Sequence, residues 1–430
     1  SYPYPTLAAA FIAAGFDPAA PGAAGFVACT DLHIGPPKTT AIPPYLVDEV
    51  NAMAPAPAFL VFTGDLICSA SLSFGQRPDA AQKAKAAAEF EIVKRDLARL
   101  RPETRVRFAP GNHDTYPGEE DAALLRSVFP EAKAYAQEEL AGLTLFFLNG
   151  GSSGDLDPRQ SEWLTTAVAA LPPQRGVVLF VHQPALGSVV AERGIGLALS
   201  GAFSRHEGPL WLVAGHHHSN GDAILQIGRT TVVQARMTTC NPAIWGDAEK
   251  PGYWVYGLRD GAVRCRVFRQ QEKGYRLAPL PDRSQARPLA VPFGGVQGIL
   301  WSLLVGDGDR QYLVSAKAAD VVSWWGYLSE VVYRLPLNGL AERPASLAVL
   351  ASLDHANADP AKRGQVALST DGVAWKDVPL AAPANGCYAV AIPADLAAGK
   401  ELYVRVSGPG YKGGAILGGF AFCGPAGRTP

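Results

Sequence analysis

The stretch LWLVAGHHHSN (residues 210–220) joins an apolar run of strand length directly to three consecutive histidines. The chain has 430 residues but only eight histidines, so three adjacent ones exceed ordinary surface composition. If the backbone is extended here, successive side chains point to opposite sides of the strand. This predicts that His216 and His218 serve one site while His217 points elsewhere, provided that other strands bring suitable partners.

Other strand-length apolar runs precede this stretch and alternate with helical segments. The runs are GFVACTDLH (25–33), AFLVFTGDL (58–66), RVRFAPGNHD (105–114), LTLFFLNGG (143–151) and GVVLFVHQP (176–184). The helix candidates between them include residues 78–100, rich in Ala, Lys, Glu and Leu, and residues 158–171. Apolar strands separated by helices predict an α/β fold whose strands are covered on both faces.

The pattern changes after the histidines. Strand signals without helices follow in TTVVQAR (230–236) and YWVYGLRDGAVRCRVFR (253–269), where Asp260-Gly261 predicts a hairpin turn. Prolines among polar residues then predict an interdomain linker over 271–297. Evenly spaced strand signals over 298–430 predict an all-β, jelly-roll-like sandwich. The expected organisation is therefore a catalytic domain over 1–270, a linker over 271–297 and a β-sandwich over 298–430.

Side chains able to bind metal follow every apolar run of the first domain except LTLFFLNGG. They are Asp31, His33, Asp65, Asn112, His113, Asp114, His182, His216 and His218. In an open α/β sheet the carboxyl ends of the strands lie side by side, so these residues should converge on one crevice. Carboxylates, a carboxamide and imidazoles suit a pair of divalent ions such as Mn, Fe, Zn or Ni rather than calcium.

Each of these residues also has an ordinary explanation when taken singly. Asp65 after a glycine is a typical helix N-cap, and Asn112 and Asp114 are typical turn residues. His33 could form a surface pair with Asp31, and His182 could be a buried, hydrogen-bonded histidine. The placement of the whole set at strand ends favours the metal site.

The ordered motifs DLH, GD, GNHD, H and GHHH resemble those of the calcineurin-like metallophosphoesterases, most closely the phosphodiesterase branch. The resemblance covers residues 25–270 and implies a metallophosphoesterase-type α/β sandwich with two metal ions. It implies that the ligands of the first ion are Asp31, His33 and His218, those of the second are Asn112, His182 and His216, and Asp65 bridges both. It also implies that His113 faces the substrate without binding metal, and that Asp114 orients the His113 ring.

The resemblance implies hydrolysis of small phosphate esters. Two divalent ions about 3.5–4 Å apart can neutralise the phosphoryl oxygens and generate a hydroxide near neutral pH. The leading hypothesis is a phosphodiesterase in which His113 protonates the leaving group. A phosphomonoesterase on the same site is the nearest alternative, since the motifs do not fix the number of ester bonds. A nuclease is disfavoured, because the net charge is −1 and no basic stripe is present.

A function of another class is carbohydrate or surface binding by the C-terminal domain. LSTDGVAWKDV (368–378) and LYVRVSG (402–408) resemble parts of galactose-binding and discoidin-like sandwiches. Trp324 and Trp325 could form a platform for a glycan, although paired tryptophans in a β-domain are more often core. A packing or dimerisation module is the favoured interpretation of this domain.

The sequence gives less information about the cellular compartment than about the site. No apolar stretch of about 18 residues predicts a membrane span. The chain opens at Ser1 rather than methionine, which is compatible with removal of an upstream signal and leads us to expect a periplasmic or secreted protein, with the cytoplasm as alternative. The six cysteines show no CxxC spacing; a Cys387–Cys423 bridge and isolated buried thiols are both compatible with the sequence.

Overall fold

The structure of the chain is a computed structural model. It describes residues 2–35, 39–70, 77–116, 122–151, 156–184, 195, 198–199, 201–216, 221–227, 229–241, 251–285, 287–288, 313–318, 328–337, 346–352, 365–379, 387–407 and 416–423. The chain divides into two compact units. The first unit contains Ser1–Pro184 and Leu197–Arg287, and the second contains Ala185–Gly196 and Pro288–Pro430.

The first sheet of the first unit has six strands around a central β1. In spatial order they are β12 (Gly274–Ala278), β11 (Ala262–Gln270), β10 (Gly252–Arg259), β1 (Ala24–Cys29), β2 (Phe59–Phe62) and β3 (Arg105–Phe108). The neighbours β1, β2 and β3 are parallel, whereas β10 pairs antiparallel with β1. The carboxyl ends of β1, β2 and β3 therefore meet at one edge.

The second sheet of the first unit has seven strands. In spatial order they are β13 (Arg287–Pro288), β8 (Gly221–Ile227), β9 (Thr230–Arg236), β7 (Leu210–Ala214), β6 (Val177–Phe180), β5 (Leu143–Phe147) and β4 (Ala136–Leu140). The central strands β5, β6, β7 and β9 are mutually parallel. This arrangement brings the ends of β6 and β7 side by side.

A continuous apolar core lies between these two sheets. Phe26 of β1 and Phe180 of β6 pack edge to face with ring centroids 5.1 Å apart, and Phe59 of β2 packs against both. Alternate residues such as Val27 and Cys29 belong instead to a second core that includes the helices. The sequence predicted strands that are covered on both faces. In the structure, helices cover one face of each sheet and the partner sheet covers the opposite face.

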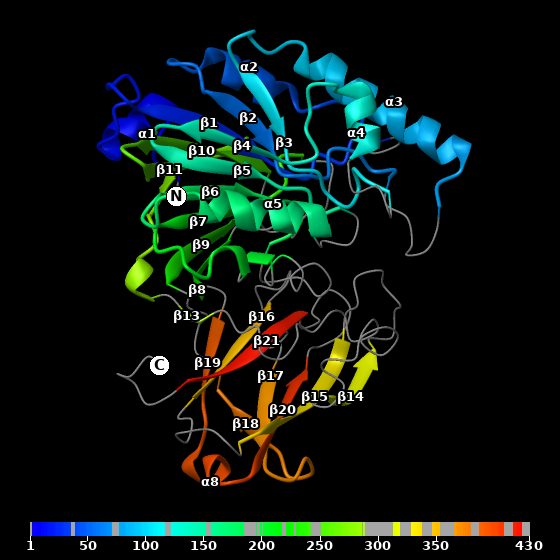
Figure 1. Cartoon of the computed structure of the whole chain (residues 1–430), viewed down its shortest axis with the longest axis vertical. Coiled ribbons are helices and arrows are strands. Elements are labelled where there is room, and N and C mark those ends of the chain that lie inside the picture. Colours follow the sequence, from blue (N-terminus) through cyan, green and yellow to red (C-terminus); the bar gives the residue numbers. More distant parts are fainter. Residues whose placement is uncertain are drawn as a thin grey trace. The chain divides into compact units, whose positions relative to one another are not determined.

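The helices of the first unit lie outside the stacked sheets (Figure 1). They are α1 (Leu7–Ala13), α2 (Pro44–Ala52), α3 (Ala80–Leu97), α4 (Ala123–Val128) and α5 (Pro158–Ala169). Trp163 of α5 packs on Phe146, on the outer face of the second sheet. Asp79 and Gln82 form a capping box that begins α3, within the predicted helix at residues 78–100. The expected metallophosphoesterase-type α/β sandwich is confirmed.

The segment expected to be a linker is partly a strand. Residues 274–278 form β12, which pairs antiparallel with β11, and Tyr275 and Ala278 are buried. The linker prediction over 271–297 is therefore wrong at its start, and the first unit extends to Arg287. The apolar side chains of this strand precede the prolines on which the prediction relied. The predicted hairpin at Asp260-Gly261 is confirmed: both residues have left-handed φ values, 52° and 69°, between β10 and β11.

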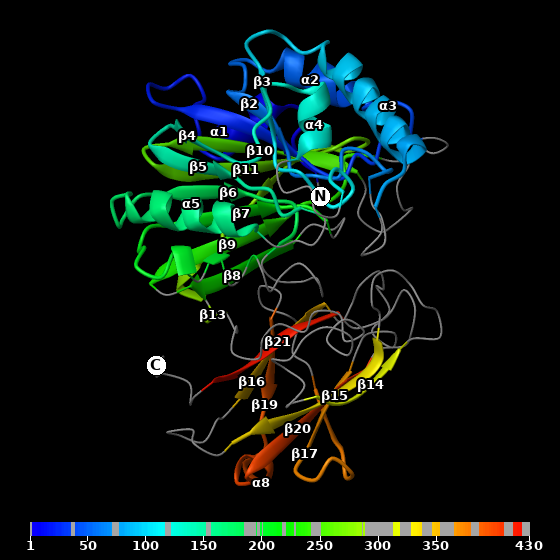
Figure 2. The ribbon, with the colours of Figure 1, turned by 45° about the vertical axis from the view of Figure 1, so that its right-hand side comes forward.

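The second unit contains two antiparallel sheets, shown from yellow to red in Figure 2. One consists of β14 (Leu313–Ala318), β15 (Leu328–Pro336), β20 (Glu401–Ser407), β17 (Gln365–Ser369) and β18 (Lys376–Val378). The other consists of β19 (Cys387–Ala391), β16 (Ser346–Ser352) and β21 (Ile416–Cys423), and the short helix α8 is Ala394–Ala397. These sheets are consistent with the expected all-β domain.

The strand register does not support a Cys387–Cys423 bridge. Cys387 pairs with Leu350 and Cys423 pairs with Ser346, on opposite sides of β16. Adjacent strands are about 4.8 Å apart, and two strand spacings plus an offset of four residues exceed the roughly 7 Å between Cα atoms that a disulfide allows. Among the described helices, none has the length and apolar composition needed to cross a membrane.

Candidate metal centre

The candidate ligands occupy loops that follow neighbouring strands of both sheets. Asp31 and His33 follow β1, Asp65 follows β2, His182 follows β6 and His216 follows β7. Backbone hydrogen bonds tie these loops together: the amides of residues 31 and 33 donate to the carbonyls of residues 64 and 65, each at 2.9 Å, and the amide of residue 215 donates to the carbonyl of residue 182. The site is thus fixed by the edges of the sheets.

The backbone at these positions is strained in a way seldom seen elsewhere in the described chain. Asp31, His33, Asp65 and His216 have left-handed φ values of 54°, 46°, 53° and 69°. Side chains other than glycine rarely adopt this region, and such strain clusters at functional sites. Gly64, with φ of 88°, could not be replaced by a larger residue, because a Cβ atom there would collide with the His182 ring.

His182 is fully buried and its ring has a fixed orientation. Its Nδ1 lies 2.7 Å from the carbonyl of Thr63, which only accepts, so Nδ1 carries a hydrogen and donates it. Its Nε2 faces the site, 3.1 Å from Asn112 Oδ1, 3.1 Å from His216 Nδ1 and 3.2 Å from Asp65 Oδ2. A backbone carbonyl behind the ring is the usual way in which a metal-ligating histidine is oriented.

Asp65 belongs to both clusters of candidate ligand atoms found among the described residues. One cluster is His33, Asp65 and His113; the other is Asp65, His182 and His216. Within each cluster the ligand atoms lie within 4.8 Å of one another. His33 Nε2 is 3.6 Å from Asp65 Oδ2 and 3.7 Å from Asp31 Oδ1. A shared carboxylate between two clusters is the arrangement that a bridging ligand requires.

The electrostatics of the centre favour positive charge. Burial lowers the pKa of the His182 imidazole, but the Asp65 carboxylate outweighs it and raises that pKa to about 9. Burial raises the pKa of the Asp65 carboxyl, yet the adjacent imidazoles of His182 and His113 bring it well below its usual range. A carboxylate that stays ionised beside converging nitrogen and oxygen atoms fits a divalent cation, which would relieve the close approach of these acceptors.

His113 and Asp114 have different partners from those expected. The His113 ring lies edge to face with the His33 ring, and its Nδ1 is 3.0 Å from the carbonyl of Cys68. The buried Asp114 carboxylate accepts instead from the backbone amides of Leu66, Ile67 and Gly111. Burial and the negative charge of Asp65 raise the pKa of Asp114 to about 7. Asp114 therefore orders the loops, and Cys68 orients the histidine.

The remaining candidates are placed only in part. Asn112 is partly exposed and directs its Oδ1 at His182, whereas His217, His218, His355, Trp324 and Trp325 lie outside the described residues. Tyr116 is buried and donates to the carbonyl of Gln82, so it packs in the core. His206 is also buried, against Phe203.

Sequence reasoning missed the carbonyls of Thr63 and Cys68, which hold the rings of His182 and His113. Every residue has a carbonyl, so no side-chain signal could have identified these two. It also missed Glu89, which binds the loop that contains Cys68. An acidic residue on the apolar face of the helix predicted over 78–100 was the available signal.

A sheet-edge site of clustered carboxylate and imidazole ligands on a double α/β sandwich defines a metallophosphoesterase domain. Residues 25–220 match the family model of the calcineurin-like phosphoesterases. The sequence resemblance is thereby confirmed. No protein in the curated collection of characterised sequences matches the chain.

Several solved structures are similar to parts of the chain. They include purple acid phosphatase PPD1 from yellow lupin (12% identity, 60% of this chain and 54% of that one, TM-score 0.41), Vps29 from Cryptosporidium parvum (13%, 60% and 96%, 0.31) and the sulfate thiohydrolase SoxB from Thermus thermophilus (15%, 69% and 62%, 0.32). The chain thus spans about half the length of the lupin phosphatase. At these values the likenesses carry no argument about activity.

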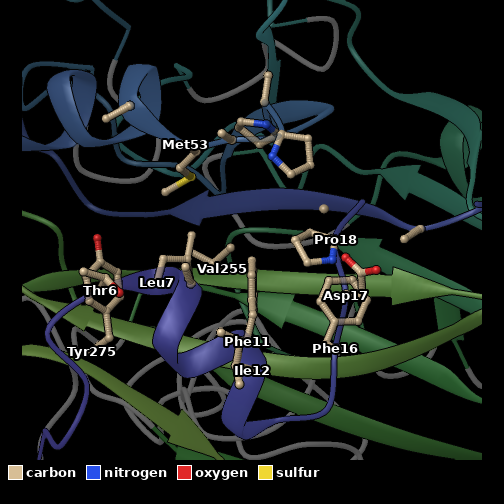
Figure 3. Close-up of a pocket in the computed structure, with 18 of the residues that line it drawn as sticks. Thr6, Leu7, Phe11, Ile12, Phe16, Asp17, Pro18, Met53, Val255 and Tyr275 are labelled. Carbon is tan, nitrogen blue, oxygen red and sulfur yellow. The ribbon is translucent and has the colours of Figure 1, made fainter. Parts of the chain in front are cut away.

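A separate cavity of about 850 Å³ lies at the opposite end of β1 (Figure 3). Its walls include Leu7 and Phe11 of α1, Met53 and Val255, and the loops before β1 and β2. None of the candidate ligands lines it. The cavity is therefore distinct from the candidate metal centre.

Proposed function

We propose that the chain is a metal-dependent hydrolase of phosphate esters that uses two divalent ions and prefers diesters. The observation that supports it best is that Asp65 Oδ2 lies close to proposed ligands of both ions, 3.6 Å from His33 Nε2 and 3.2 Å from His182 Nε2. A single ion would not require a shared carboxylate between the His33 and the His182–His216 sides. Mn, Fe, Zn and Ni suit this mixture of oxygen and imidazole nitrogen ligands.

In this proposal Asp31, His33 and His218 would hold one ion, Asn112, His182 and His216 would hold the other, and Asp65 would be shared between them. The bound ions would supply Lewis acidity and lower the pKa of water. The chain's own groups set the geometry: the carbonyl of Thr63 keeps the hydrogen of His182 on Nδ1, so that Nε2 presents a lone pair to the centre.

His113 is the proposed proton donor to the leaving alkoxide. Its Nδ1 hydrogen is committed to the carbonyl of Cys68, so only Nε2 can exchange a proton with the substrate. The protonated ring donates from Nε2 while the Cys68 carbonyl stabilises the ring's positive charge. Preference for a diester over a monoester rests on the likeness of the motif set to the phosphodiesterase branch.

The test is elemental analysis of the purified protein combined with turnover on paired esters. We expect about two equivalents of Mn, Fe, Zn or Ni per chain, and faster hydrolysis of bis-nitrophenyl phosphate than of nitrophenyl phosphate. One equivalent in a fully active enzyme would contradict the two-ion proposal. A preference for the monoester would favour the phosphomonoesterase and leave the metal centre intact.

We further propose that the protein acts in the periplasm or outside the cell. The second unit is proposed as a packing module rather than a glycan-binding one. Trp375, in the stretch that resembles galactose-binding sandwiches, has the Arg405 guanidinium 4.6 Å from its ring centroid, so one ring face is already covered. A glycan array on the full chain tests this, and specific binding would reverse the assignment.

A further inference from the structure

The peptide group between Cys68 and Ser69 is held by charged or ionisable side chains at both ends. Its carbonyl oxygen lies 3.0 Å from His113 Nδ1, and its N–H, from Ser69, lies 3.0 Å from Glu89 Oε2. The peptide group is rigid and planar, so a group that fixes its N–H also fixes the direction of its carbonyl. Glu89 is thereby linked to His113 through one peptide plane.

Glu89 comes from α3 and is only 2% exposed. Its Oε1 accepts from Ser69 Oγ at 2.6 Å, and its Oε2 also accepts from the Cys68 amide at 3.2 Å. The neighbouring positions on this helix face, Ala86, Phe90 and Val93, are buried and apolar. A carboxylate on such a face is costly to bury unless its oxygens are hydrogen-bonded. Among the described residues, all hydrogen bonds of the Glu89 carboxylate go to Cys68 and Ser69. The carboxylate therefore stabilises this one loop.

We propose that Glu89 is a positioning residue for His113, acting through the Cys68–Ser69 peptide group; this rests on the proposed role of His113 in proton donation. A carboxylate bonded to the N–H polarises the peptide group and makes its carbonyl a stronger acceptor. The stronger acceptor keeps the hydrogen of His113 on Nδ1 and holds the ring in one orientation, with Nε2 left for other contacts. Glu89 and the Cys68–Ser69 peptide group together then orient the imidazole, as a carboxylate bonded directly to a histidine does in other sites.

Asp114, the residue expected to orient His113, does not compete for this role. Its oxygens accept from Leu66, Ile67 and Gly111 and touch neither the ring nor the Cys68–Ser69 peptide group. The two buried carboxylates therefore bind different parts of the loop after β2. Asp114 fixes its first residues, and Glu89 fixes the peptide group that reaches His113.

The test compares Glu89→Gln with Asp96→Asn. Asp96 is a matched control, because it is buried on the same helix and accepts from the amide of Ile42, away from His113. In single-turnover assays, Glu89→Gln should slow an alkyl phosphodiester by about 10–100-fold and a nitrophenyl diester much less, at unchanged metal content. Asp96→Asn should lower the melting temperature without changing the ratio of the two rates.

A double-mutant cycle separates positioning from general damage. In a His113→Ala background, Glu89→Gln should cause no further loss on the alkyl ester, since its effect passes through the missing ring. A full additional loss, or equal losses on both esters in the wild-type background, would overturn the proposal.

Crystal structures of the wild type and both variants give a readout that does not need activity. Glu89→Gln should turn the Cys68 carbonyl and displace the His113 ring, whereas Asp96→Asn should leave both in place. An unmoved ring in Glu89→Gln overturns the positioning role. If the wild type hydrolyses none of the esters but the ring moves, the proposed function fails while the positioning role stands.

Discussion

The two ends of β1 differ in a way that distinguishes a chemical site from ordinary packing. At the carboxyl end, carboxylates and imidazoles converge, and four of these residues have left-handed φ values. At the amino end lies an apolar cavity of about 850 Å³, and Glu49 in its lining is already paired: it binds Arg269 and accepts from the Tyr253 hydroxyl. Strained backbone and converging polar atoms, rather than open volume, mark the site.

The largest effect is expected from Asp65→Asn at the carboxyl end. Loss of the shared charge should release metal from both clusters and lower turnover by more than about 100-fold, the upper range for residues that only orient ligands. Elemental analysis and ester hydrolysis measure both. Glu49→Gln, a matched change at the amino end, should keep metal and activity. Two retained metals in Asp65→Asn would show that Asp65 does not bridge.

His216→Ala should remove one ligand and also lower turnover by more than about 100-fold. His217→Ala is the control, because His217 belongs to neither proposed ligand set. The left-handed φ of 69° at His216 departs from the extended backbone that the sequence predicted, so the control does not depend on strand alternation. Metal content and kcat are measured for both variants, and only His216→Ala should lower them. Equal losses would mean that the ligand register of the three histidines is shifted.

His113→Ala should keep the metals and slow an alkyl ester by about 10²–10⁴-fold through loss of general acid catalysis. A nitrophenyl ester, whose leaving group departs with little help, should be slowed far less. Single-turnover rates make chemistry the measured step. The same penalty on both esters would argue that His113 stabilises the phosphoryl oxygens instead.

Met53→Ala probes the cavity at the amino end. Met53 is 8% exposed, so the change should cost about 2 kcal/mol of unfolding free energy, the lower end for such truncations. Urea unfolding measures the loss, and kcat should stay at the wild-type value. A fall in kcat at full metal occupancy would show that the two ends are coupled.

The smallest effect is expected from deleting the second unit after Pro288. Every described ligand belongs to the first unit, and β12 and β13 complete its sheets. Metal content and turnover on small esters should be retained. A deletion after Gln270 serves as the contrast: it removes β12 from the edge of the first sheet and should lower the melting temperature. A folded but inactive 1–288 chain would mean that the second unit completes the site.

The features that the sequence could predict are those carried by side-chain type and spacing. Apolar runs located β1, β2, β3, β6 and β7, and the polar residues directly after them identified Asp31, Asp65 and His182. The helix predicted over 78–100 became α3 because its composition and N-terminal Asp79 both favour a helix.

The features that escaped prediction depend on contacts between distant segments. An apolar run reads the same whether a helix or a second sheet covers it, so the stacking of two sheets could not be deduced. Tyr275 entered the sheet because β11 offered an open edge, although prolines follow soon after. The partner of His113 is a backbone carbonyl, whereas the family resemblance implied Asp114.

The antiparallel pairing of β1 with β10 has a consequence for how the chain is made. Val27 pairs with Val255, more than half the length of the chain away. During synthesis one edge of β1 therefore stays unpaired until β10 has been translated. Pairing between strands so distant in sequence is slow. Until then, the apolar strand offers unpaired N–H and carbonyl groups to other chains. Chaperone demand during expression should accordingly fall once residues 252–270 have emerged.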